Sequence, residues 1–228
     1  MEALLYDKTL NCPVCRRDFK SKKVRSRKLM IAEKHDDLNI VYKEVNPLHY
    51  QIFVCPECGY TGTEGEFEDI SPVHKKIFDD QVRYKWKERN YGEKRKIEEV
   101  IETYKLALLT AQLFRKPKSY IGNICLKLAW VYREIGDHKE EEFLRYALTN
   151  LQDAYQQEKL DHASINEITT AYIVAELNRR FENYKEAIVW YTKVLDNPEI
   201  KNHRQLQLKT REQWRLAKEE YDQHKNAV

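Results

Sequence analysis

The residues of this chain that are best suited to chemistry are four cysteines in two Cys-Pro-x-Cys units, Cys12–Cys15 and Cys55–Cys58. Two thiolates separated by two residues, in a turn that proline starts, can both point at one ion, and tetrahedral zinc then needs a second such pair. The chain has only five cysteines among its 228 residues, so this pairing is hard to attribute to chance. We therefore predict a structural Zn²⁺ site whose ligands are Cys12, Cys15, Cys55 and Cys58.

Other uses of these cysteines fit the sequence less well. Disulfides need an oxidising compartment, and residues 1–10 have neither the basic start nor the apolar run of a secretion signal. A thioredoxin-like redox pair stays open as an alternative, although the βαβ surroundings of such a pair are missing. No stretch approaches eighteen apolar residues, so we expect no membrane span.

The residue after each unit has a backbone role. A tight turn tends to need positive φ just past the second thiolate, and Gly59 meets that need without a Cβ penalty. Arg16 holds the same place in the first unit, which makes this unit the less ideal half. His35 and His49 are other potential ligands, but with four paired cysteines we interpret both as surface or packing residues.

A basic segment follows the first unit. Its cations are Arg16, Arg17, Lys20, Lys22, Lys23, Arg25, Arg27 and Lys28. Cations near a Zn(Cys)₄ centre can simply balance its formal charge of −2 and stay solvated. The alternative is a patch that contacts nucleic-acid phosphates, as in other basic zinc modules. Apolar residues are sparse here, so we expect an exposed strand pair or loop, with further strands at Asn39–Tyr42 and His49–Val54.

The rest of the chain reads as helical, because it is rich in helix formers and nearly free of glycine and proline. Ser71-Pro72 supplies an N-cap and a proline at the first helical position, and Gly136-Asp137 ends one helix and caps the next. The expected helices run from Ser71 towards Trp86, from Ile97 to about Lys116, from Ser119 to Ile135, through Phe143 to Leu151, from about Ala163 to Phe181, from Tyr184 to Leu195, and from about Asn202 to His224.

Two stretches of these helices resemble tetratricopeptide repeats. Leu128–Tyr132 followed by Gly136-Asp137 is similar to one half-repeat, and Ala175, Tyr184, Ala187 and Tyr191 with Pro198 are similar to the next. The spacing from Ala129 to Ala175 is forty-six residues instead of thirty-four, and Glu141 and Arg145 stand where alanine and an aromatic are usual. An irregular helical bundle therefore stays open as an alternative.

We predict an α+β, mostly α fold in which a small zinc-ribbon β head precedes an antiparallel helical-hairpin solenoid. The predicted domains are a Cys₄ domain at 1–65, a connecting helix at 66–94 and a tetratricopeptide-like domain at 95–228. The Cys-Pro-x-Cys start, the basic segment and the stretch from Asn46-Pro47-Leu48 to Cys58-Gly59-Tyr60 resemble the uncharacterised bacterial family known as domain of unknown function 2225. The resemblance implies a cytoplasmic bacterial protein with a zinc-ribbon head and a helical-repeat body, and it supplies no function.

We expect no enzyme, because no catalytic constellation is evident and four thiolates leave zinc no open position. The first hypothesis is a scaffold that binds an unknown protein or peptide in a concave groove of the helices. By the repeat register the groove would be lined by Asn123, Trp130, Arg133, Tyr172, Glu176, Arg179 and Arg180. The alternative for this groove is that Arg179 and Arg180 are solvated helix-end charges and Trp130 is core.

Two other functions stay open. One is nucleic-acid binding through the basic segment, and the other is a thiol redox or zinc-sensing switch, which would require labile zinc. The sequence identifies no partner and leaves the oligomeric state open.

Overall fold

The computed structural model of the chain describes residues 4–161 and 165–227. The chain forms two compact units. Unit 1 comprises residues up to 35, 39–116 and 127–140, and unit 2 comprises 36–38, 117–126 and the residues from 141 onwards. The mostly helical α+β class is confirmed. The predicted domain boundaries at residues 65 and 94 do not coincide with this division, because the helix that begins at Ile97 packs on strands that lie before residue 65.

The strands of unit 1 form three antiparallel hairpins. They are β1 (Leu5–Asn11) with β2 (Asp18–Val24), β3 (Ile31–Lys34) with β4 (Ile40–Tyr42), and β5 (Ile52–Val54) with β6 (Thr61–Thr63). In β1–β2 the register runs from Leu5 opposite Val24 to Asn11 opposite Asp18, so the first Cys-Pro-x-Cys unit is the turn of this hairpin. The second Cys-Pro-x-Cys unit likewise connects β5 to β6, in which Ile52 pairs with Thr63 and Val54 pairs with Thr61.

One predicted strand is shorter than expected. The sequence indicated a strand over His49–Val54, but Pro47–Tyr50 form a 3₁₀ turn and the strand β5 begins only at Ile52. The Asn46 side chain caps this turn by accepting a hydrogen bond from the Leu48 N–H at 3.0 Å, and Pro47 fixes the first backbone angle. This local capping outweighs the strand preference of the aromatic and β-branched residues.

The helices follow the expected ranges, except that the first, predicted to continue towards Trp86, ends at Gln81 and is followed by a 3₁₀ turn at Arg83–Lys85. They are α1 (Pro72–Gln81), α2 (Ile97–Leu113), α3 (Lys118–Glu134), α4 (Lys139–Gln157), α5 (Glu167–Arg180), α6 (Tyr184–Asp196) and α7 (Arg204–Ala227). The Ser71 hydroxyl accepts from the His74 N–H at 3.2 Å, and Asp137 Oδ1 accepts from the Lys139 N–H at 2.8 Å. The expected start of the fifth helix at Ala163 lies outside the described residues.

Buried polar groups fix helix α2 to the strands within unit 1. Tyr104 is fully buried and its hydroxyl donates to Leu48 O at 2.9 Å. The Arg95 guanidinium, 7% exposed, donates to the backbone carbonyls of Tyr91, His49 and Ile52, each at 2.8 Å. Because three carbonyls satisfy this buried cation, Arg95 binds the start of α2 to the strand that leads into the second Cys-Pro-x-Cys unit.

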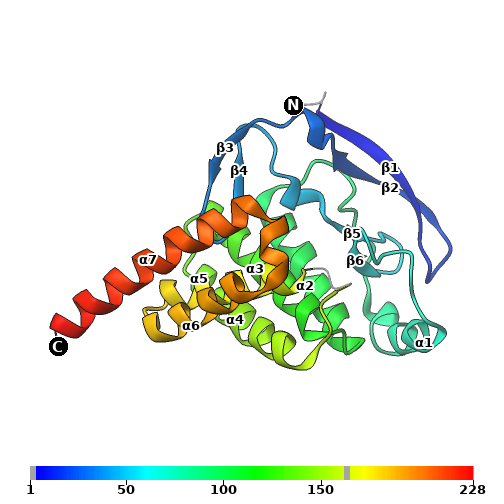
Figure 1. The fold of residues 1–228 in the computed structure, drawn as a ribbon. Coiled ribbons are helices and arrows are strands. Elements are labelled where there is room, and N and C mark those ends of the chain that lie inside the picture. Colours follow the sequence, from blue (N-terminus) through cyan, green and yellow to red (C-terminus); the bar gives the residue numbers. More distant parts are fainter. Residues whose placement is uncertain (1–3, 162–164, 228) are drawn as a thin grey trace. The chain divides into compact units, whose positions relative to one another are not determined.

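The last three helices of unit 2 pack on one another in sequence (Figure 1). Helix α5 packs on α6 and α6 packs on α7, whereas α5 and α7 share few contacts. Ala175 of α5 and Ala187 of α6 are fully buried, and the rings of Tyr172 and Tyr191 lie 5.9 Å apart. Among the described residues, no helix combines the length and the apolar character that crossing a membrane requires.

Candidate metal centre

The two Cys-Pro-x-Cys turns have matching backbone hydrogen bonds. In the first turn the Arg16 N–H donates to Cys12 O at 2.9 Å, and the Cys12 N–H donates to Arg17 O at 2.9 Å. In the second, the Gly59 N–H donates to Cys55 O at 2.9 Å and the Cys55 N–H donates to the next carbonyl, that of Tyr60, at 2.8 Å. Each pair of cysteines is therefore presented by the same rigid turn at the end of a hairpin.

The residue that follows each pair has positive φ, as the sequence indicated. Gly59 has φ +75° and Arg16 has φ +63°. The Trp86 ring covers Gly59 so closely that an added Cβ would lie 2.3 Å from Cε3 of the indole. The same indole N–H donates to Pro56 O at 2.7 Å, so Trp86 packs on the second turn and holds its shape.

The four predicted ligands come together. Their sulfur atoms all lie within 4.8 Å of one another, with Cys12 Sγ 3.6 Å from Cys58 Sγ and Cys15 Sγ 3.6 Å from Cys55 Sγ. In a tetrahedron of thiolates at about 2.3 Å from zinc, the sulfur atoms are about 3.8 Å apart. The arrangement therefore fits one metal ion, and a donor set of four thiolates suits zinc or iron.

The site is buried, and its thiols are electrostatically coupled. Cys12, Cys55 and Cys58 are at most 1% exposed. Hydrogen bonds from Cys55 and Cys58 lower the pKa of Cys12 to about 4. Hydrogen bonding to Cys12 raises the pKa of Cys55 and of Cys58. A divalent ion would bind all four as thiolates and release the protons that this coupling retains.

An aromatic cluster surrounds the sulfurs on the protein side. Phe67 is fully buried, and its ring makes contacts with those of Phe19, Phe53 and Tyr60 at centroid distances of 5.0–5.8 Å. Tyr60 in turn meets Phe78 of helix α1 edge to face at 5.6 Å. The cluster joins both hairpins to the helix, so the folding of this part of unit 1 and the assembly of the sulfurs depend on each other.

The predicted basic segment divides into paired and exposed cations. Lys22 Nζ lies 2.7 Å from Asp7 Oδ1, and Lys23 pairs with Glu64. Burial would raise the pKa of Glu64, but hydrogen bonds from Lys23 and Lys8 outweigh it and lower that pKa. The side chains that stay exposed are Arg16, Arg17, Lys20, Arg25, Arg27 and Lys28.

The predicted groove residues fall in both units. Trp130, 9% exposed, and Arg133 belong to unit 1, where Arg133 Nε donates to Glu140 Oε1 at 2.6 Å. The residues of the groove prediction in unit 2 are Asn123, Tyr172, Glu176, Arg179 and Arg180. Three of these are brought together by the structure: Tyr172 is fully buried, Glu176 is 4% exposed, and Glu176 Oε1 accepts from Arg179 Nη2 at 2.8 Å. Arg180 is exposed.

His35 and His49, the two other potential ligands, have polar partners of their own within unit 1. His49 Nε2 lies 2.8 Å from Glu134 Oε2, and Arg133 Nη1 lies 2.8 Å from His35 Nδ1, so both histidines have packing contacts away from the sulfurs.

Sequence reasoning missed Arg95 and Trp86 as supports of the metal turns. Nothing in the local pattern distinguishes either from other charged or aromatic residues in a polar stretch.

Comparison with known proteins supplies the family. Residues 5–217 match the family described as uncharacterized protein conserved in bacteria (DUF2225). A curated relative, an uncharacterized protein of Borreliella burgdorferi (strain ATCC 35210 / DSM 4680 / CIP 102532 / B31), is 27% identical over 156 residues, which cover 60% of this chain and 55% of the relative. The chain thus spans about half the length of that relative. No solved structure matches. Since the family match extends over nearly the whole chain and includes both cysteine pairs, the chain belongs to this bacterial family of uncharacterised proteins.

Proposed function

We propose that the chain is a protein-interaction scaffold without enzyme activity, stabilised by a structural zinc ion on Cys12, Cys15, Cys55 and Cys58. The observation that carries the proposal is the closed sulfur site. Four thiolates complete the tetrahedral coordination of zinc, and three of them are at most 1% exposed. Such a site contributes folding free energy and offers no position for a substrate or a catalytic water.

We interpret the predicted Cys₄ domain, residues 1–65, as a zinc ribbon. Two hairpins carry equivalent Cys-Pro-x-Cys turns with matching backbone hydrogen bonds, as expected if a single ion joins them. The ion would supply on the order of 10 kcal/mol of coupled folding free energy in such a small module. The strands alone bury too little apolar surface to replace that contribution.

We interpret the packing of the helices in unit 2 as similar to that of tetratricopeptide repeats. Sequential packing of α5, α6 and α7 is the arrangement of a solenoid, in which each element contacts its neighbours. Fully buried alanines at 175 and 187 allow the close approach of two helices that this repeat uses. A solenoid of this kind presents an open face to partner proteins, and Arg180 is the exposed residue of the predicted lining in this unit.

A comparative capture experiment tests the scaffold. The wild-type protein, Arg180→Glu and the control Lys201→Glu, each cross-linked in a bacterial lysate, are compared by mass spectrometry. Both positions are exposed, and only Arg180 belongs to the predicted lining. The scaffold predicts proteins that are retained by wild type and Lys201→Glu and depleted with Arg180→Glu. Identical sets from all three proteins would reject the predicted groove.

Nucleic-acid binding is the second candidate, favoured by the six exposed cations of the basic segment. If these cations contact phosphates, log K falls linearly with log salt, by about 0.7–0.9 per contact. Arg17→Glu with Lys20→Glu should reduce that slope, whereas Lys22→Gln and Lys23→Gln, which remove paired cations, should change it less. Absence of binding to mixed DNA and RNA at low salt would eliminate this candidate.

A further inference from the structure

The segment Asp36–Leu38 belongs to unit 2, although the residues on either side of it belong to unit 1. It is the tip of the β3–β4 hairpin, which the His35 N–H closes by donating to Asn39 O at 2.9 Å. Strand β3 is exposed along its whole length, whereas Asp37 at the tip is only 4% exposed. The tip is therefore held by contacts of its own within unit 2.

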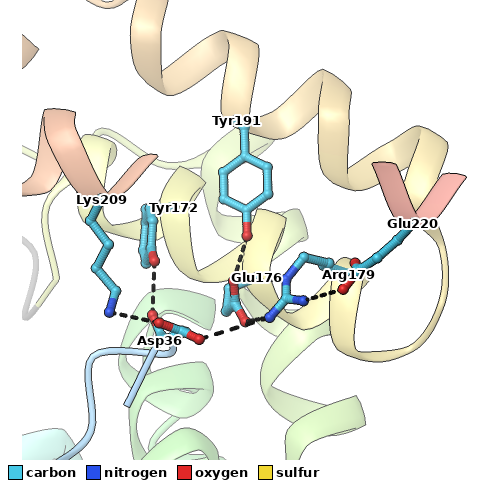
Figure 2. A network of polar contacts seen from close by, with 7 residues as sticks. All are labelled: Asp36, Tyr172, Glu176, Arg179, Tyr191, Lys209 and Glu220. Atoms are coloured by element: carbon cyan, nitrogen blue, oxygen red, sulfur yellow. Dashed lines mark hydrogen bonds and ion pairs between the residues drawn. The ribbon is translucent and has the colours of Figure 1, made fainter. Parts of the chain in front are cut away.

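Figure 2 shows that donors from two helices converge on Asp36. Tyr172 of α5 donates its hydroxyl hydrogen to the backbone carbonyl of Asp36 at 2.8 Å. Lys209 of α7 donates to Asp36 Oδ1 at 2.9 Å, and Arg179 Nη2 lies 4.0 Å from Asp36 Oδ2. One contact thus recognises peptide backbone, and the two cations recognise a carboxylate.

The arginine in this group is held independently of Asp36. Arg179 Nη2 donates to Glu176 Oε1 and its Nη1 to Glu220 Oε1, both at 2.8 Å. Tyr191 donates to the other oxygen of Glu176, so the buried carboxylate that orients the guanidinium is itself fixed (Figure 2). A donor that is held in position before an acid arrives loses little conformational entropy on binding it.

The backbone of the tip is strained. Leu38 has φ +68°, in the left-handed region where a residue with a Cβ costs about 1–2 kcal/mol. Three-residue hairpin loops usually place glycine at such a position. Strain of this kind persists only where the surrounding contacts determine the conformation, and it is found at ligand clamps and switch regions.

We propose that Tyr172, Arg179 and Lys209 form a recognition site for a short acidic turn of a partner protein, whose aspartate takes the place of Asp36, and that the chain's own Asp36–Leu38 covers this site. The inference rests on the proposed scaffold function and names the chemistry of its partner. Because the covering segment is part of the same chain, it competes with a partner for the site. The apparent affinity for a partner is then the intrinsic affinity multiplied by the fraction of sites that are uncovered. The chain therefore limits its own binding until a partner present at sufficient concentration displaces the tip.

A peptide-binding experiment on the full chain tests the inference. The probe is a fluorescein-labelled peptide with the sequence of residues 33–40, Glu-Lys-His-Asp-Asp-Leu-Asn-Ile, followed by fluorescence anisotropy. The double variant Asp36→Ser, Leu38→Gly, which uncovers the site, should bind the peptide at least about tenfold more tightly than wild type, the ratio expected when the tip covers about nine-tenths of the wild-type sites. Adding Lys209→Glu should abolish that binding, and the peptide with asparagine in place of both aspartates should not bind.

Two outcomes overturn the inference. The first is an uncovered variant with wild-type circular dichroism and Tm that does not bind the peptide, because the tip is then only an intramolecular clasp. If the double variant does not fold, Asp36→Asn, which removes only the charge recognised by Lys209 and Arg179, takes its place under the same criterion. The second is equal binding with and without Lys209→Glu.

Lysate capture separates this inference from the proposed function. Suppose that wild type and Lys209→Glu capture the same partners and that Arg180→Glu loses them. This result supports the scaffold but places its binding surface elsewhere, which contradicts the acidic-turn site. Peptide binding without any partner that depends on Arg180 or Lys209 supports the site and contradicts the scaffold.

Discussion

Replacing Gly59 by alanine should weaken metal binding far more than the same replacement at Arg16. Gly59 has φ +75°, where a Cβ costs about 1–2 kcal/mol. The new Cβ would also lie 2.3 Å from Trp86 Cε3, so the indole must move, at an overpacking cost of about 1–3 kcal/mol. Moving the indole weakens its 2.7 Å hydrogen bond to Pro56 O, worth about 1 kcal/mol.

These terms give about 3–6 kcal/mol for Gly59→Ala. Arg16→Ala keeps a Cβ at φ +63°, so its backbone strain is unchanged and its cost should stay below about 0.5 kcal/mol. Metal binding and the folding of the turns are coupled, and each 1.4 kcal/mol changes an equilibrium constant tenfold. Gly59→Ala should therefore lower the affinity for zinc by at least about a hundredfold, whereas Arg16→Ala should leave it within about threefold.

Competition with a chromophoric chelator measures both affinities on the full-length protein. Trp86→Phe combined with Gly59→Ala is the informative third variant, because a smaller ring leaves room for the added Cβ and should recover part of the loss. Equal affinities for Gly59→Ala and Arg16→Ala would refute the account of strain and close packing at the second turn.

Three other predictions concern buried groups. Arg95→Met leaves three backbone carbonyls unsatisfied and should lower the free energy of unfolding in urea by about 2–4 kcal/mol. The control Arg89→Met removes one member of an exposed ion pair and should lower it by less than about 1 kcal/mol. Equal losses of stability in the two variants would contradict this prediction. Metal removal should open the two Cys-Pro-x-Cys turns, whereas Cys125 is no ligand and burial raises its pKa to about 12, so thiol titration near pH 8 should detect four thiols after metal removal and the fifth only on complete unfolding. Because the pKa values of Cys55 and Cys58 are raised, these thiols bind protons in competition with metal, and zinc affinity should fall at least about tenfold per unit as pH drops from 8 to 6; a flat profile in chelator competition would contradict this.

Much of the fold was predictable because its signals are local. Ser71-Pro72 and Gly136-Asp137 mark helix ends through hydrogen bonds to their own neighbours, and the structure contains those bonds. The paired cysteines were equally predictable, because their spacing within each unit already fixes the geometry of two ligands. The positive φ after the second pair was also predictable, because glycine at position 59 indicates that conformation.

The remaining features depend on contacts that no short pattern encodes. Strand β1 (Leu5–Asn11) was missed because it gains strand structure from pairing with the basic segment. Arg95 looks like any cation in a polar loop until three distant carbonyls surround it. Leu38 gives no signal of positive φ, since only glycine and asparagine indicate that conformation, and the two aspartates before it resemble an ordinary solvated loop.

The central claim, one metal ion on four sulfurs, is tested most directly by X-ray absorption spectroscopy of the purified protein at the zinc edge, together with metal content per chain. The account predicts one zinc ion with four sulfur neighbours at about 2.3 Å, and its loss in Cys12→Ser with Cys58→Ser. A metal-free protein with four reactive thiols, or zinc with nitrogen or oxygen neighbours, would contradict it.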